Sequence, residues 1–109
     1  MDLENTQSQM RKGILEYCIM CIIDKKECYA SDIIDRMKEA KLIVVEGTLY
    51  PLLTRLKNAG LLNYKWEESK SGPPRKYYTL TTEGEEFLEG MHATWSELSG
   101  AVNKILKNK

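Results

Sequence analysis

The chain has 109 residues, which is enough for one folded domain with its own core but too few for two ordinary domains. Hydrophobic residues make up 42% of the sequence and charged residues 29%, a composition that excludes a disordered chain. Sixteen basic residues balance sixteen acidic ones, which excludes a protein that is basic throughout but not one with a local basic face.

The N-terminus and the apolar stretches predict a soluble, cytoplasmic protein. The longest apolar stretch, residues 14–23, has about half the length that a membrane-spanning helix needs. The first ten residues, MDLENTQSQM, are polar and carry acid rather than base, unlike a signal peptide. We therefore expect no membrane contact, and we expect residues 1–9 to form a loose tail.

Three helices are predicted in the first sixty residues. Residues 10–24 are apolar nearly all round, which is typical of a central helix. A brief strand at 28–30 precedes a second helix, which is expected to start at its N-cap Ser31 and to end near Ala40. The third helix follows Glu46 and ends at Gly60, with Pro51 near its start. Its buried stripe consists of Leu49, Leu52, Leu53 and Leu56.

The pattern then changes from helical to alternating. Residues 61–68 place apolar side chains on one face of a strand, and residues 75–80 form a second strand. Residues 69–74 between them have turn chemistry, so the segment is a β-hairpin with a basic, Gly/Pro-rich tip. We expect Tyr77 and Tyr78 to support the core.

A long helix completes the chain. Thr82 and Glu85 form a capping box that predicts its start, and the helix is expected to reach Leu106. Its apolar residues recur at spacings of three and four, which is typical of a helix that packs against a second copy. This predicted dimer interface consists of Leu88, Met91, Trp95, Leu98, Val102 and Ile105. The first helix is also more apolar than one small domain buries, so we expect a homodimer of first and last helices.

The order of these elements is that of a winged helix-turn-helix. The predicted fold class is mainly α (α+β): a winged helix-turn-helix with a two-stranded β wing and a long C-terminal helix. Residues 10–81 form the expected DNA-binding domain and residues 82–109 the dimerisation helix, together in one compact unit.

The third helix carries residue types that reach phosphates and base edges in a DNA groove. Opposite its leucines lie Gly47, Tyr50, Pro51, Thr54, Arg55 and Asn58, with Thr48 and Lys57 towards the edges of this polar face. The hairpin adds Lys70, Arg75 and Lys76 around a rigid turn. Residues 41–80 contain seven basic and three acidic residues, a local basic excess that favours DNA over an ordinary solvated face.

Two blocks of the sequence resemble the PadR-type transcriptional regulators. Residues 46–62, EGTLYPLLTRLKNAGLL, are similar to the recognition-helix motif of that family. Residues 72–84, GPPRKYYTLTTEG, resemble its wing and the start of its last helix. The resemblance covers roughly residues 10–106. One departure lies at the start of the second helix, where family members often have glycine in place of Ala30 and an aromatic residue in place of Ser31.

The resemblance implies a compact, homodimeric repressor that binds double-stranded DNA at a roughly palindromic operator. By analogy, the helix contacts DNA through Thr48, Tyr50 and Arg55, with Lys57 near a phosphate. The implied wing contacts are Lys70, Ser71, Gly72 and Arg75. Some compact members sense planar aromatic drugs through a tryptophan at the position of Trp95. Met91 and Trp95 are therefore candidate ligand residues for a small planar aromatic effector, unless Trp95 only fills the dimer interface.

Other functional classes find little support in the sequence. It contains no P-loop, no dinucleotide fingerprint and no acid/base pair, so we expect neither an enzyme nor a cofactor. Cys18 and Cys21 have the spacing of metal and redox sites, but they lie in an apolar helix, and we expect free thiols without a metal. Two alternatives stay open: a metal- or redox-sensing winged-helix regulator, and a dimeric adaptor that binds protein but not DNA.

Overall fold

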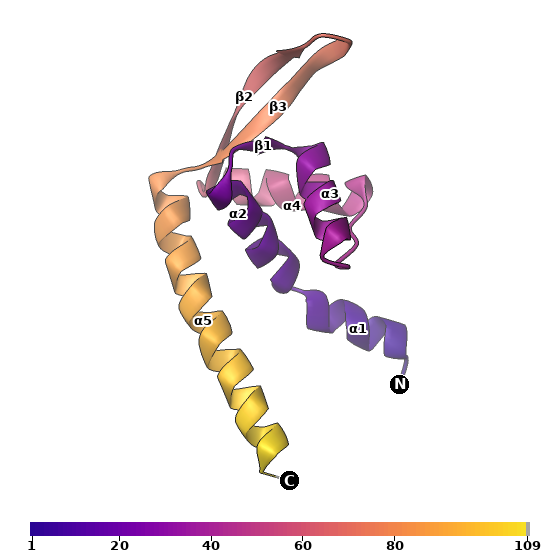
Figure 1. Cartoon of the computed structure of the whole chain (residues 1–109), viewed down its shortest axis with the longest axis vertical. Coiled ribbons are helices and arrows are strands. Elements are labelled where there is room, and N and C mark those ends of the chain that lie inside the picture. The colour runs from indigo at the N-terminus through magenta and orange to yellow at the C-terminus, as the bar shows by residue number, and fades with distance from the viewer. Residues whose placement is uncertain (109) are drawn as a thin grey trace.

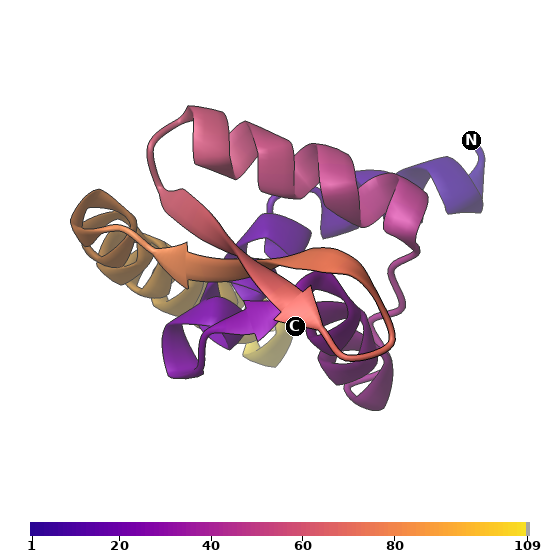
Figure 2. The ribbon, with the colours of Figure 1, turned by 90° about the horizontal axis from the view of Figure 1, so that it is seen from above.

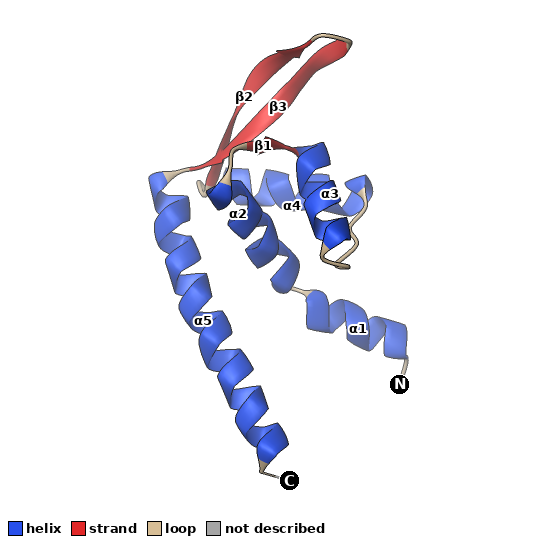
Figure 3. Ribbon diagram, in the orientation of Figure 1, coloured by secondary structure: helices blue, strands red, loops and turns tan. Residues whose placement is uncertain are grey.

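The computed structural model describes residues 1–108. Lys109, the last residue of the predicted dimerisation segment 82–109, lies outside the described residues. Within the described range the chain forms five helices and three strands (Figure 1, Figure 3). They are α1 (Leu3–Arg11), α2 (Ile14–Lys25), β1 (Cys28–Tyr29), α3 (Ala30–Glu39), α4 (Glu46–Asn58), β2 (Leu62–Ser69), β3 (Gly72–Leu80) and α5 (Thr82–Lys107).

The molecule is elongated, with extents of 57 × 32 × 23 Å. Helices α2, α3 and α4 form its body, from which the β2–β3 hairpin projects at one end (Figure 1). Helices α1 and α5 extend towards the other end. This arrangement agrees with the predicted winged helix-turn-helix with a long C-terminal helix, and it separates the wing from the C-terminal half of α5.

The N-terminal segment differs from the expectation, because residues 3–11 form helix α1 and not a loose tail. The Asp2 carboxylate caps this helix by accepting a hydrogen bond from the Glu4 amide at 3.0 Å. The predicted helix over residues 10–24 is therefore two helices, which are separated at Gly13. Gly13 has a φ of +85°, a left-handed conformation that glycine adopts without steric cost. Helix α1 buries none of its residues.

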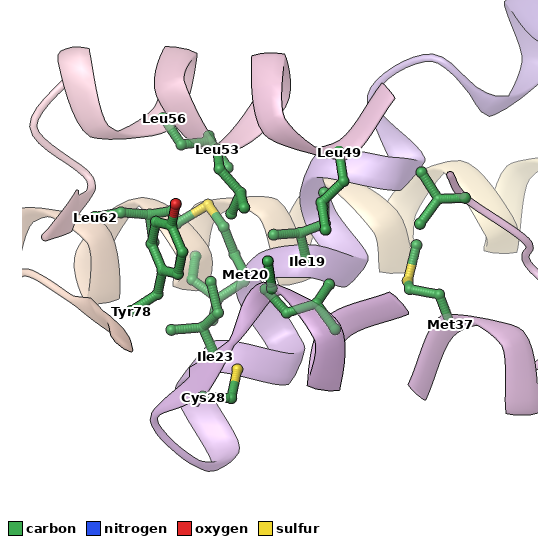
Figure 4. Packing of buried hydrophobic residues seen from close by; sticks show 14 residues of the cluster. Ile19, Met20, Ile23, Cys28, Met37, Leu49, Leu53, Leu56, Leu62 and Tyr78 are labelled. Carbon is green, nitrogen blue, oxygen red and sulfur yellow. The ribbon is translucent and has the colours of Figure 1, made fainter. Parts of the chain in front are cut away.

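The core lies between α2 and α4 and is closed by α3 and the sheet. Figure 4 shows Ile19 and Met20 of α2 facing Leu49 and Leu53 of α4. The leucine stripe predicted for the third helix is confirmed, although Leu52 is only half-buried. The fully buried side chains of largest volume are Ile19, Met20, Ile33, Met37, Leu49 and Leu53. Burial of these apolar side chains fixes which face of α4 remains in solvent.

Two predicted N-caps are displaced along the chain. Helix α3 begins after Tyr29 and not after Ser31, because the Asp32 carboxylate accepts from the Tyr29 amide at 3.0 Å. Helix α5 begins after Thr81 and not after Thr82, because the Thr81 hydroxyl accepts from the Gly84 amide at 2.9 Å. In both cases an earlier residue completes the capping hydrogen bond.

The sheet has three antiparallel strands in the order β1-β3-β2. The predicted brief strand is confirmed as β1, which pairs with β3 through Tyr77 and Tyr78. The turn of the hairpin is shorter than predicted: only residues 70–71 form it, and Pro73 and Pro74 belong to β3. Strand β1 pairs only with Tyr77 and Tyr78 of β3. On the β1 side of the hairpin, no neighbouring strand therefore needs the amide hydrogens that Pro73 and Pro74 lack.

A close contact fixes the direction of α5. The Thr81 hydroxyl donates to the Gly60 carbonyl at 2.6 Å, and the Thr81 amide donates to the Leu61 carbonyl at 3.1 Å. A Cβ atom on Gly84 would lie 2.0 Å from the Leu61 carbonyl oxygen, so only glycine fits there. Helix α5 therefore leaves the body from a rigid junction with the end of α4.

Candidate nucleic-acid interface

Helix α4 turns its polar face outwards at the side of the molecule from which the wing projects. All eight residues that the sequence places on this polar face are exposed. Pro51 is the sixth residue of α4, so the helix lacks the hydrogen bond that residue 51 would donate to the Gly47 carbonyl. The face therefore offers hydroxyl groups, a guanidinium, an ammonium and a phenol ring to a partner in solvent.

The wing and α4 enclose a concave surface. Figure 2 shows the β2–β3 hairpin lying between α4 and α3. A hollow of about 510 Å³ lies between these three elements, and a smaller one of about 200 Å³ lies between the wing and the C-terminal half of α4. The larger hollow brings together the predicted residues Tyr50, Arg75 and Lys76, and the smaller one brings together Thr54, Lys57 and Lys76. Lys76 lines both hollows.

The lysines of this surface lie over aromatic rings. The Lys76 ammonium is 4.5 Å from the centre of the Tyr64 ring and 5.6 Å from that of Trp66. The Lys57 ammonium is 5.7 Å from the Tyr64 ring. Attraction between a cation and the face of a ring restrains these long side chains at the concave surface. Their positive charge is thus already positioned where an anion would approach.

Arg55 has one partner within the protein and is still largely in solvent. Its Nη1 lies 3.7 Å from Oε1 of Glu16 on α2, and its side chain is 74% exposed against 16% for Glu16. An ion pair with one partner in water contributes little stability, so exchanging Glu16 for another anion or a base edge costs little. Arg55 is therefore oriented on the outer face of α4 and free to bind.

The remaining predicted wing residues lie at two different places. Lys70 and Ser71 form the exposed turn at the tip of the hairpin, next to Gly72, and line neither hollow. Arg75 lies further down the wing, where its Nη2 donates to the Ser31 hydroxyl at 2.6 Å. The structure thus brings Arg75 to the start of α3, while the tip residues extend beyond the body.

Sequence reasoning missed three residues of this surface. Trp66 is 63% exposed on β2, although alternation placed it with the buried residues of that strand. Tyr29 and Ser31 line the larger hollow, although the sequence assigned them only to a strand and an N-cap. For Trp66 the available signal was the alternation of cations and aromatic residues on the two wing strands, which places Trp66 opposite Lys76. No local pattern pointed to Tyr29 and Ser31.

Tyr78 forms a common wall of both hollows. Burial, and to a lesser extent the neighbouring hydroxyls of Tyr50 and Tyr64, which oppose a second negative charge, together raise the pKa of its hydroxyl to about 12. Tyr78 therefore remains neutral and supports the surface without adding charge to it, in agreement with the expectation that it belongs to the core.

The apolar stripe of α5 is divided between the core and the surface. Leu88 is only 3% exposed and belongs to the core of its own chain, so little of its side chain is left for the predicted dimer interface. Met91 is half-buried and packs against the core. Further along the helix the apolar side chains are exposed: Trp95, Leu98, Val102, Ile105 and Leu106. The stripe begins to face solvent where α5 leaves the body.

A second concave surface lies at the joint between α2 and α5. The Tyr17 hydroxyl and the His92 Nδ1 share a hydrogen bond of 2.5 Å across this joint. Beside it is a hollow of about 610 Å³, to which Met91 and Trp95 contribute. Its other apolar lining residues are Ile14, Tyr17, Phe87 and Leu98. The two candidate ligand residues thus line one apolar hollow.

The cysteines are free thiols in the structure. Cys18 and Cys21 are half-buried and Cys28 is buried. Burial raises the pKa of all three thiols, to about 11 for Cys28, which keeps them protonated near neutral pH. Among residues 1–108, no three His, Cys, Asp or Glu side chains are arranged to hold a metal ion. No helix in the same range is long and apolar enough to cross a membrane.

The comparison with solved structures finds close likeness. A PadR-like transcription factor from Bacteroides fragilis is 65% identical, with a TM-score of 0.79, over 93% of this chain and 98% of that one. A PadR-like transcriptional regulator from Bacillus cereus is 39% identical, with a TM-score of 0.80, over 90% and 96% of the two chains. The Bacillus subtilis PadR, solved in complex with operator DNA, is 26% identical with a TM-score of 0.67. That likeness covers 72% of this chain but 46% of the Bacillus subtilis chain.

A family model matches the same part of the chain. The model of the "Transcriptional regulator PadR-like family" matches residues 19–90, from the middle of α2 into α5. The family and these neighbours are transcriptional regulators and not enzymes. Together with the winged-helix architecture and the close structural neighbours, this match shows that the chain belongs to the PadR-like family of transcriptional regulators.

Proposed function

We propose that this PadR-like regulator binds DNA sequence-specifically as a homodimer, acts as a repressor and is released by a small planar aromatic ligand. The observation that carries the proposal is the joining of the α4 face and the basic residues of the wing in one concave surface. The operator complex of the Bacillus subtilis relative supports the same use of the fold here.

The geometry favours insertion of α4 into the major groove. Thr48, Tyr50 and Arg55 are then directed to base edges, where hydrogen bonds distinguish sequences. Lys57 lies at the edge of the face and suits a phosphate. The wing tip, with Lys70 and Ser71 beside Gly72, reaches past the body to the neighbouring DNA backbone.

The homodimer is supported by apolar surface that one chain leaves in solvent. Trp95 is 45% exposed and Ile105 is 73% exposed on α5, and α1 buries none of its residues. A contiguous apolar stripe of this kind favours association with a second copy. Two copies related by a two-fold axis present two α4 helices, which requires a roughly palindromic operator with half-sites about one helical turn apart.

The hollow beside Trp95 supports the aromatic effector. It combines an indole with the thioether of Met91 and the rings of Tyr17 and Phe87, a lining that suits flat apolar molecules. The ligand releases DNA only if it binds the DNA-free form better than the bound form. Its position at the joint of α2 and α5 allows it to change the separation of the two α4 helices.

The test of DNA binding is fluorescence anisotropy with a labelled duplex from upstream of the protein's own gene and a scrambled duplex of equal length. We expect tighter binding to the native duplex, weakened by salt because bound cations are released from phosphates. Failure to bind either duplex at low salt contradicts the proposal and favours the adaptor, in which the α5 stripe binds a protein partner.

The effector is tested by fluorescence in the variant Trp66→Phe, which leaves Trp95 as the single tryptophan. We expect planar aromatic compounds to quench Trp95 and to release the operator duplex over the same concentration range. Quenching by no member of the panel, in a variant that still binds the duplex, contradicts the ligand site and leaves Trp95 as an interface residue.

A further inference from the structure

Arg75 connects the wing to the start of α3. The two parts are 44 residues apart in the chain, yet the Arg75 Nη2 donates to the Ser31 hydroxyl at 2.6 Å. The guanidinium carbon also lies 4.0 Å from the centre of the Tyr29 ring, which places the flat cation over the face of the ring. Arg75 therefore makes two contacts of different kinds with two residues at the beginning of one helix.

The Tyr29 ring is itself held in place. Tyr29 pairs with Tyr77 in the sheet, and their rings meet edge to face at 5.0 Å. The Tyr29 amide donates to the Asp32 carboxylate, and its hydroxyl donates to Glu67 at 3.5 Å. Glu67 is the residue opposite Arg75 in the β2–β3 pair. The ring is thus a fixed platform between α3 and both wing strands.

These contacts are not explained by attraction of Arg75 to the helix. The N-terminus of α3 carries a partial positive charge, which disfavours a cation nearby. Stacking on Tyr29 and the hydrogen bond to Ser31 hold the guanidinium there instead. The planar guanidinium can stack on the ring and, from its edge, donate to Ser31 at the same time, whereas the compact ammonium of lysine cannot make both contacts in this geometry.

The contact of Arg75 with α3 also affects the surface that α4 and the wing form together. Helix α3 packs against α4, and the wing forms the other wall of the larger hollow. A connection between the wing and α3 therefore fixes the angle between the wing and α4. That angle decides whether both elements reach one duplex together.

We propose that Arg75 is a positioning residue, which fixes the wing against α3 through Tyr29 and Ser31 so that α4 and the wing engage DNA together. This role replaces the direct DNA contact that the resemblance implies for Arg75, and it rests on the proposed DNA-binding function. A direct phosphate contact of Arg75 does not involve the Ser31 hydroxyl, whereas the positioning role needs both the guanidinium and that hydroxyl.

The first test compares Arg75→Lys, Ser31→Ala and their combination by anisotropy on the operator duplex. We expect Arg75→Lys to weaken binding about tenfold, although the charge is retained. Ser31→Ala is expected to weaken binding as well, and the double variant to bind no more weakly than Arg75→Lys alone. The control Lys70→Ala, at the wing tip, is expected to lower the salt slope by about one phosphate contact.

The second test is independent of DNA. Amide hydrogen exchange in the free protein is expected to quicken over residues 75–78 of β3 and over residues 64–67 of β2, which pair with them. We expect this change in both Arg75→Lys and Ser31→Ala, with an unchanged melting temperature. This measurement distinguishes failure of the positioning role from failure of the proposed DNA binding, because hydrogen exchange compares the free wild-type and variant proteins and gives a result even where no duplex binds. Wild-type affinity in Arg75→Lys, or full additivity in the double variant, overturns the positioning role; so does unchanged wing exchange.

Discussion

Gly84 is the residue on which the direction of α5 depends. A Cβ atom there would lie 2.0 Å from the Leu61 carbonyl oxygen, a backbone atom that cannot move aside without shifting the α4–β2 connection. We expect Gly84→Ala to lower the free energy of unfolding by about 1–3 kcal/mol, as for other overpacked sites. Urea denaturation measures this change.

Gly100 supplies the matched control on the same helix. Nothing lies within 4 Å of a Cβ atom at Gly100, so Gly100→Ala is expected to stabilise the helix by about 0.5–1 kcal/mol through lower backbone entropy. Equal effects of the two substitutions would contradict the close contact at Gly84.

Tyr78 makes stability depend on alkaline pH. Its pKa is raised to about 12 in the folded protein from about 10, so folding favours the neutral hydroxyl. The stability that comes from keeping the Tyr78 hydroxyl neutral is fully present below pH 10 and is lost as the pH rises through 12. We expect Tyr78→Phe, which has no hydroxyl to ionise, to lose less stability between pH 10 and 12 than the wild type in chemical denaturation. An equal loss of stability in Tyr78→Phe and in the wild type over this pH range would contradict the role of Tyr78.

Arg55 is the residue of α4 most suited to reading a base, because it is exposed and carries a two-pronged donor. We expect Arg55→Ala to cost about 1–3 kcal/mol of operator affinity in anisotropy titrations. Arg55→Lys, which keeps the charge, separates base reading from phosphate attraction: it restores affinity only if the contact is to a phosphate. An unchanged affinity in a folded Arg55→Ala dimer excludes the role.

Among the helices and strands, the sequence predicts those whose apolar residues recur at a regular spacing within the element itself. The α4 leucines alternate with the polar face at helical spacing, so both faces follow from the pattern alone. Helix α1 was missed because it has no apolar stripe, and only Asp2 and the charges at its ends signal it. The contact between Arg75 and Ser31 lies outside any local pattern, since packing of the sheet on α3 creates it.

The exposed apolar residues of α5 lead to a prediction about the oligomeric state of the protein. Ile105 is 73% exposed in the single chain, so Ile105→Glu leaves the protomer fold intact and places a charge in the proposed interface. We expect this variant to be monomeric at micromolar concentration by light scattering. The control Ser96→Glu, which adds the same charge on the side of the helix opposite Ile105, is expected to remain dimeric. A wild-type protein that is itself monomeric contradicts the dimer.

At the scale of the whole molecule, the β2–β3 wing and the C-terminal half of α5 lie at opposite ends (Figure 1). The joint of α2 and α5 lies between them, with the Tyr17–His92 hydrogen bond and the hollow beside Trp95. In the proposed homodimer, a change at this joint is expected to alter the separation of the two α4 helices without touching the surface formed by α4 and the wing. This separation suits a regulator in which one end binds the operator and the middle senses a ligand.

The most direct measurement is hydroxyl-radical footprinting of the protein on the region upstream of its own gene. If a homodimer binds through two α4 helices, we expect two protected half-sites about one helical turn apart on one side of the duplex. We expect this protection to be lost in Arg55→Ala and in Ile105→Glu. Even, salt-sensitive coverage along the whole fragment, or no protection at a concentration at which the dimer forms, would contradict sequence-specific binding by two α4 helices.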